Sequence, residues 1–338
     1  MTKRWTRRPE GSNWGDFGED DQLGRLNLLT AENTRKAAEE IKQGLRFCLS
    51  LPLDIPATNA TNARRLPPEL KPIVRDGHVA FGLPLGLIHE GFTDVNSDEA
   101  MVIYSQHSTQ WDSFAHMGSM FDPTGEGGAK PLAYNGYSVF NENGEARQGK
   151  VGAWNLGIEH MARQCVQGRG VLVDLVAHFG RENKAVGYDD LMRVLEADGV
   201  EIEEGDIACL YTGYADVLIE QGEDLDPELP TKQCPALDGW DDKLLKWIDD
   251  SGISVLASDN RAVEYEYGRL KDGIERGPGM PIHELCLFKL GIHLGEMWYF
   301  AEISRWLKAN GRYRFFVTAP PLHVPGAVGS PANPIGTV

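Results

Sequence analysis

The sequence predicts an α/β or α+β fold in which helices pack against a sheet. Three observations support this class. After residue 150, runs rich in β-branched and aromatic residues alternate with segments of helical periodicity. Hydrophobic residues make up 41% of the chain, which is typical of a folded globular protein. With 338 residues, the chain is long enough to bury a sizeable core in one large domain or two smaller ones.

The first predicted element is a helix over residues 31–43. Thr30 can cap its N-terminus, Glu32 suits the positive end of its dipole, and Gly44 ends it. The predicted strands lie at residues 101–105, 171–175, 207–212, 253–257 and 314–318. The further predicted helices lie at residues 188–198, 242–249, 283–290 and 299–309.

Two segments lack clear periodicity. Residues 52–98 contain six prolines and the pair Arg64–Arg65, which predicts long loops around a few short strands. Long loops within a compact domain are often functional covers, and we expect one here. Residues 320–338 are rich in Pro and Gly, so we expect an extended surface arm rather than a further element.

Composition also limits the partners of the protein. A formal net charge of −17 disfavours nucleic acid and anionic membranes, because binding to either needs a basic surface. No apolar run approaches the roughly 18 residues of a membrane helix. The five cysteines are scattered without a CxxC pair, which indicates buried thiols rather than disulfides or zinc ligands. We therefore expect a cytoplasmic protein that acts on a small molecule, with no nucleic-acid or membrane partner.

The densest group of potential metal ligands is HSTQWDSFAH, residues 107–116. If the strand that begins at residue 101 continues to Asp112, its side chains alternate between two faces. Gln106, Gln110 and Asp112 then share one face. His107 and Trp111 share the other, so we expect the conspicuous His107 to point away from any site.

A divalent metal needs three or four converging donor atoms, so a second cluster must contribute. His116 rejoins Asp112 if the chain turns helical after the strand. The best second cluster is PIHELCLFKLGIHLGEMWYF, in which His283 opens a helix-like segment and Glu296 follows a glycine-bounded turn. His293 lies nearby, and we interpret it as scaffold.

The two clusters resemble motifs of the metal-dependent cyclase family that includes bacterial kynurenine formamidase and isatin hydrolase. TQWDSFAH and HELCLFKLGIHLGE carry the resemblance, and WGDFGEDDQLGRLNLLT, GRGVLVDL, GDIACLYTG, ASDNRAVE and GSPANP extend it along most of the chain. The first motif of the family is HxGTHxDxPxH. This sequence keeps Thr109, Asp112 and His116, but Gln106 and Gln110 stand at the first two His positions. It therefore resembles a divergent subgroup, with TQWD in place of GTHxD.

For the fold, the resemblance implies a swivelling β/β/α architecture with a mixed sheet and packed helices. We expect a single domain over residues 1–338, with an N-terminal extension (1–30) and the Pro/Gly-rich C-terminal arm (320–338). The resemblance also implies a homo-oligomer, a dimer or a tetramer. The C-terminal arm is suited to contacting a neighbouring subunit.

For the site, the resemblance implies a hydrolase that uses metal-activated water. His283 and Glu296 fall where the family has its remaining metal ligands. We expect one divalent metal, held by Asp112, His283, Glu296 and the carbonyl oxygen of Gln110. Such oxygen-rich ligation favours manganese, with zinc as the other choice. His116 would carry a proton from water to the leaving group, and Glu296 would be the second catalytic residue.

The expected substrates are a small cyclic amide, imide or lactone, or an aryl formamide, from the catabolism of an aromatic compound. The two lost histidines argue against kynurenine formamidase activity itself. We expect Trp111, Trp298 and Gln106 to line the substrate pocket, and either Arg64 or Arg65 to pair with a substrate carboxylate.

One alternative from a different class remains open. The chain could be a metal-independent descendant of the same fold that binds a small ligand, or that catalyses a lyase or isomerase step with His116 and Glu296 as acid and base. The sequence has no GxSxG elbow, Walker loop, strand-linked GxGxxG or HExxH motif, which argues against a serine hydrolase or a nucleotide enzyme.

Overall fold

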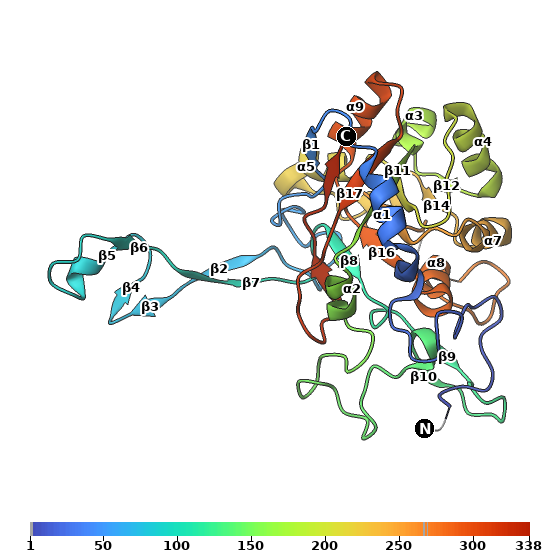
Figure 1. The fold of residues 1–338 in the computed structure, drawn as a ribbon, viewed down its shortest axis with the longest axis horizontal. Coiled ribbons are helices and arrows are strands. Elements are labelled where there is room, and N and C mark those ends of the chain that lie inside the picture. Colours follow the sequence, from blue (N-terminus) through green and yellow to red (C-terminus); the bar gives the residue numbers. More distant parts are fainter. Residues whose placement is uncertain (1–2, 266–267, 269) are drawn as a thin grey trace.

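The structure, a computed structural model that describes residues 3–265, 268 and 270–338, is built around a nine-stranded mixed sheet (Figure 1). The strand order is β1-β19-β17-β11-β13-β15-β16-β8-β18. Four neighbouring strands, β11, β13, β15 and β16, are parallel, and antiparallel strands flank them on both sides. The strands are β1 (Arg46–Cys48), β8 (Gln110–Asp112), β11 (Gln167–Asp174), β13 (Ile207–Tyr211), β15 (Val255–Ser258), β16 (His293–Glu296), β17 (Arg314–Thr318), β18 (Gly329–Pro331) and β19 (Ile335–Thr337). The predicted α/β class with a mixed sheet is confirmed.

Helices cover both faces of this sheet (Figure 1). Helices α4 (Tyr188–Asp198) and α7 (Asp242–Asp250) bury leucine, valine and isoleucine side chains against one face. Helices α2 (Ile158–Gln164) and α9 (Ala301–Ala309) do the same on the other face. Alternate residues of the central strands enter the two cores, as the pleat requires. The other α-helices of the described residues are α1 (Ala31–Ala38), α3 (Leu175–Phe179), α5 (Tyr214–Gln221), α6 (Leu229–Lys232) and α8 (Pro281–His283), and η5 (Glu284–Leu290) is a π-helix. Four short 3-10 helices are η1 (Gly24–Leu28), η2 (Leu85–Leu87), η3 (Tyr134–Gly136) and η4 (Gly222–Asp224).

Two predicted elements have the observed bounds, the helix over 188–198 and the strand over 314–318. The first helix is shorter than predicted. Thr30 caps α1 as expected, by accepting a hydrogen bond from Asn33 N, but the helix ends at Ala38 instead of residue 43. The chain leaves the helix because the N–H groups of residues 43 and 44 donate to the carbonyl of Val338, at the far end of the sequence.

The strand predicted at residues 101–105 does not continue to Asp112, so the condition for one alternating strand is not met. Strand β7 ends at Val102 and β8 begins at Gln110. Side chains between them bind other parts of the molecule and pull the backbone out of line. His107 Nε2 lies 2.9 Å from Pro56 O, and Ser108 Oγ donates to Pro52 O. The alternation of side chains survives only within β8.

Residues 69–102, called the arm below, project away from the body (Figure 1). The arm contains paired strands β2 (Glu69–Pro72) and β7 (Glu99–Val102), β3 (Val74–Arg75) and β4 (His78–Val79), and β5 (Leu83–Pro84) and β6 (Val95–Asn96). Within the arm, only Ala80 and Leu83 are buried. The arm therefore covers nothing within its own chain, so the predicted functional cover does not extend over residues 69–98. Residues 52–66 alone stay against the body.

The C-terminal prediction is also wrong. The composition of residues 320–338 predicts no further element, yet the segment contains β18 and β19, and Val338 is fully buried. Strand β18 pairs with β8, with Gly329 opposite Asp112, so the chain terminus frames the strand that carries the predicted ligands. The expected contact of this segment with a neighbouring subunit stays a prediction. The smaller sheets of the body pair β9 (Ser119–Phe121) with β10 (Lys130–Leu132), and β12 (Ala185–Val186) with β14 (Ala236–Leu237).

Candidate metal centre

Strand β8 directs two polar side chains to one face of the sheet. Gln110 and Asp112 are two residues apart and point the same way, while Trp111 points to the other face. Glu296 lies opposite Gln110 on the neighbouring strand β16, so its side chain joins the same face. Gln110 and Asp112 are fully buried, and Glu296 is 3% exposed. Three polar groups thus meet in a place that water barely reaches.

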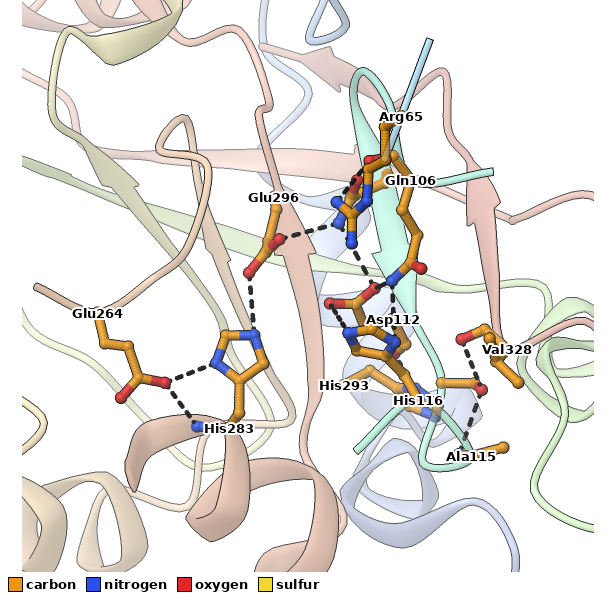
Figure 2. Close-up of polar contacts among 12 residues, drawn as sticks. Arg65, Gln106, Asp112, Ala115, His116, Glu264, His283, His293, Glu296 and Val328 are labelled. Atoms are coloured by element: carbon orange, nitrogen blue, oxygen red, sulfur yellow. Dashed lines mark hydrogen bonds and ion pairs between the residues drawn. The ribbon is translucent and has the colours of Figure 1, made fainter. Parts of the chain in front are cut away.

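His283 approaches this face from outside the sheet (Figure 2). It ends α8, and its Nε2 lies 3.2 Å from Oε1 of Glu296. One ligand atom each from Asp112, His283 and Glu296 lie within 4.8 Å of one another. The fold therefore brings together the three His, Asp and Glu side chains that the sequence singles out as metal ligands.

Glu264 holds the ring of His283 in place. Its Oε1 lies 2.6 Å from Nδ1 of His283 and also accepts the backbone N–H of the same residue. Because a carboxylate fixes the proton on Nδ1, Nε2 is the nitrogen that faces the centre, and it could bind a metal in exchange for its own proton. Sequence reasoning missed Glu264. The only signal was its place at the end of ASDNRAVE, which supported the family resemblance without suggesting a role.

The cluster has the charge and the open atoms that suit a divalent cation. Within the described chain, Oδ2 of Asp112 is buried and accepts no hydrogen bond, and the buried Oε1 of Glu296 has only the ion-pair contact with His283. Burial and then the negative charge of Asp112 raise the pKa of Glu296. Burial would lower the pKa of His283, but its contacts with Glu264 and Glu296 outweigh this effect and raise that pKa to about 10. Buried charges of this kind need a partner, and a cation between the carboxylates would supply one.

The two glutamines act as hydrogen-bond donors. Gln110 Nε2 lies 2.9 Å from Glu296 Oε2, and Gln106 Nε2 donates to Asp112 Oδ1. This orientation does not test the predicted ligation of a metal by the carbonyl oxygen of Gln110, which stays a prediction. Two close carboxylates attract the amide N–H groups, and Oε1 of Gln110 is left without a partner among the described residues.

His116 lies at the rim of the cluster. Its Nδ1 is 3.1 Å from Gln106 Nε2, and its Nε2 is 3.9 Å from Asp112 Oδ2. The turn from Ser113 to His116 brings the ring back toward Asp112, as the sequence predicts. Burial lowers the pKa of His116, and the charge of Asp112 opposes this only in part. The imidazole is therefore neutral at neutral pH, with one nitrogen facing the centre.

The predicted aromatic pocket is wrong. Trp111 and Trp298 are fully buried in the core on the opposite face of the sheet, where their rings meet edge to face at 5.0 Å. Both indole N–H groups are used, with Trp111 donating to Ala319 O and Trp298 to Gln110 O. Both side chains therefore support β8 from behind rather than contacting a substrate.

The other residues predicted for the site differ in whether they contact the cluster. Arg64 is exposed, whereas Arg65 is half-buried beside the cluster and donates from Nη1 to Gln106 O over 2.6 Å. His107 points away from the cluster, toward the loop at Pro56, as predicted. His293 is buried and stacks on Phe114 with ring centres 3.9 Å apart. Of the predicted substrate contacts, Gln106 touches the centre and Arg65 lies beside it, but Arg64 does neither.

The fold and the site define the class of this protein. It is an α/β protein with a mixed sheet and a buried cluster of Asp, His and Glu side chains. Comparison with known protein families narrows this class to one family. The model of the Cyclase family matches residues 48–265, which is more than half of the chain. The protein therefore belongs to the cyclase family. No protein with a curated description matches the chain.

Comparison with solved structures gives the same fold. The crystal structure of a novel cyclase is 30% identical, with a TM-score of 0.74, and the match covers 97% of this chain and 99% of that one. Isatin hydrolase A from Ralstonia solanacearum is 14% identical, with a TM-score of 0.54, over 91% of this chain and 96% of that one. An isatin hydrolase bound to the product analogue thioisatinate is also 14% identical, with a TM-score of 0.53 and coverage of 92% and 98%. The isatin hydrolases share the fold. No helix among the described residues is long and apolar enough to cross a membrane.

Proposed function

We propose that the protein is a metal-dependent hydrolase that opens a small cyclic amide, imide or lactone, or cleaves an aryl formamide. The observation that carries this proposal is the buried cluster of Asp112, His283 and Glu296, in which Oδ2 of Asp112 accepts no hydrogen bond from the described residues and Oε1 of Glu296 contacts only His283. The fold shared with isatin hydrolases supports the reaction class.

The donor set fits one zinc or manganese ion, which Asp112, His283 and Glu296 would hold. Three protein ligands are the usual number at catalytic metals, which keep a further position for water or substrate. When bound, such an ion polarises a carbonyl group and lowers the pKa of water toward neutrality. Two carboxylates and one imidazole form an oxygen-rich set, which favours manganese over zinc.

His116 is the group of this chain that would move the proton. Gln106 binds its Nδ1, so the ring is held with Nε2 toward Asp112. Burial keeps the imidazole neutral, and because Gln106 Nε2 donates to Nδ1, the ring proton lies on Nε2. To act as the proton carrier, His116 would take a proton from water at Nδ1 in place of the Gln106 contact and give the Nε2 proton to the leaving nitrogen or oxygen. Gln106 thereby orients both Asp112 and His116, which makes it a positioning residue.

The metal-independent lyase or isomerase remains the alternative, with His116 and Glu296 as the acid and base. One experiment separates the two proposals. Protein purified without chelator is analysed for bound elements and assayed against a cyclic imide, a lactone and an aryl formamide. The hydrolase proposal expects about one equivalent of zinc or manganese and hydrolysis of at least one of these substrates.

Asp112→Ala should then lose both the metal and turnover, because it removes one of three ligands. Asp198→Ala is the matched control, since it removes a carboxylate from the end of α4, outside the cluster, and should keep both. An Asp112→Ala variant with full metal content would overturn the assigned ligands. Metal-free wild-type protein with full activity would favour the alternative.

A further inference from the structure

The chain turns sharply directly after the proposed ligand Glu296. Strand β16 ends at Glu296, and the next residue, Met297, has a φ of +51°. Residues other than glycine, asparagine and aspartate rarely adopt this left-handed conformation, because Cβ then crowds the following carbonyl oxygen. Such a conformation persists only where the surrounding structure holds it. The contacts that hold Met297 therefore also hold the backbone from which the Glu296 side chain projects.

Two hydrogen bonds hold the backbone of Met297. Its N–H donates to Asn260 O over 2.9 Å, and its carbonyl oxygen accepts the hydroxyl proton of Thr109. The Met297 side chain is buried and packs with Leu51 and Tyr214 in an apolar cluster. The turn is thus fixed at both of its backbone polar groups and at its side chain.

Thr109 uses its whole hydroxyl group to hold this turn. The register that pairs Gln110 with Glu296 places Thr109 opposite Met297. Thr109 is fully buried, and its Oγ1 donates to Met297 O and accepts the backbone N–H of Leu51 over 2.8 Å. A threonine hydroxyl has only one proton to donate. That proton is committed to the turn, so the Thr109 hydroxyl is a structural anchor rather than a donor to a substrate.

This anchor joins the two strands that carry the carboxylate ligands. Thr109 lies directly before β8, which contains Asp112, and Met297 lies directly after Glu296 on β16. The two carboxylates point toward one centre from these neighbouring strands (Figure 2). A metal tolerates ligand distances only within about 0.2 Å of their ideal values. A change of conformation at Met297 would move Glu296 relative to Asp112 and weaken metal binding.

We propose that Thr109 is a positioning residue for the metal ligand Glu296. By holding Met297 in the left-handed conformation, the hydroxyl of Thr109 fixes the direction in which the Glu296 side chain leaves β16. This inference rests on the proposed function, because it concerns the affinity of the cluster for its metal. It also assigns a role to a residue outside the set of proposed ligands and proton carriers.

Replacement of the hydroxyl is the first test. Thr109→Val keeps the shape of the side chain and removes the hydroxyl, so the affinity for zinc and for manganese, measured by competition with a chelator, should fall by about tenfold or more. Thr109→Ser keeps the hydroxyl and should bind both metals nearly as tightly as wild type. Ser254→Ala is the matched control. It removes another buried hydroxyl that donates to backbone carbonyls, those of residues 205 and 206, and should lower stability without changing metal affinity.

A second pair of variants separates positioning from general destabilisation. In the Thr109→Val protein, Met297→Gly and Met297→Ala both remove the side chain from its apolar cluster, but only glycine adopts a positive φ without strain. The glycine double variant should therefore bind metal several-fold more tightly than the alanine double variant. With Thr109 intact, the hydroxyl holds the turn in either case, and the two single variants should bind metal about equally. Circular dichroism shows whether each variant is folded.

Hydrogen–deuterium exchange of metal-free protein gives a readout that does not depend on the metal. Because the Met297 amide donates to Asn260 O, the peptide over residues 293–300 should exchange faster in Thr109→Val than in wild type or Thr109→Ser.

The positioning role is overturned by any of three results. Thr109→Val could bind metal as tightly as wild type, the exchange of this peptide could be unchanged, or the two double variants could bind metal equally. If wild-type protein binds no metal, the proposed hydrolase fails, and exchange still decides whether Thr109 holds the turn after Glu296.

Discussion

Two buried histidines lie ten residues apart in the sequence and have opposite properties. His283 donates from Nδ1 to Glu264 and faces Glu296, and its pKa is raised to about 10. His293 bonds through Nδ1 to the backbone carbonyl of Asp112, and burial lowers its pKa to about 4. No described residue forms a hydrogen bond with its Nε2, and its ring stacks on Phe114.

This difference shows that burial alone does not identify a functional histidine. Both rings are equally shielded from water, so desolvation acts on both in the same direction. What separates them is the partner, because a carboxylate stabilises the charged ring whereas a single backbone carbonyl does not compensate for burial. A ring held by one carboxylate and facing another is suited to a cation, and a neutral ring stacked on phenylalanine is suited to a core.

The difference between the two histidines is tested most directly by replacing each of them with glutamine. His283→Gln should leave no metal after dialysis and no measurable turnover, since the only nitrogen ligand of the cluster is lost. His293→Gln keeps an N–H for the carbonyl of Asp112, so it should retain about one equivalent of metal. Elemental analysis of both variants measures the difference. Equal metal content in the two variants would contradict a ligand role for His283 and a scaffold role for His293.

The next largest effect is expected at Glu264. Glu264→Gln removes the charge that orients His283, and metal affinity should fall by about 10–100-fold, the usual cost of losing such a partner. Competition with a chelator measures this affinity. Glu284→Gln is the control, because Glu284 lies on η5 next to His283 and contacts Ser119 instead of the cluster. If both variants bind metal equally well, Glu264 does not position the ligand.

The sequence predicted those parts of the fold that depend on local interactions. Helix α4 and strand β17 have the predicted bounds, because periodicity and flanking residues determine them. The predictions that were wrong concern segments whose structure depends on residues far away in the sequence. The first helix ends early because residues 43 and 44 bind the C-terminus, and the tail at 320–338 becomes two strands because the sheet offers it partners. Pairing across hundreds of residues leaves no local pattern.

In the site, too, some features follow from the local sequence and others depend on distant residues. Asp112, His283 and Glu296 could be found because their motifs are dense in ligands and resemble a family, and the structure brings them together. The orientation of Gln110 could not be predicted, since it depends on the two carboxylates that it faces. Glu264 was missed because nothing near it in sequence indicates that a histidine 19 residues later turns back onto its side chain.

The smallest expected effect concerns stability and leaves activity unchanged. The folded-state pKa of His293 is about 4, below the ordinary value of 6.5, so between these values the unfolded chain binds more protons than the folded one. The free energy of unfolding should therefore fall as the pH drops from 6.5 to 4, by roughly 3 kcal/mol from this group. His293→Gln should remove that part of the slope, because glutamine does not titrate. Urea unfolding at several pH values measures the slope for the wild type and for the variant. If His293→Gln is as acid-sensitive as the wild type, His293 is not held neutral, and the contrast with His283 would not rest on their hydrogen-bond partners.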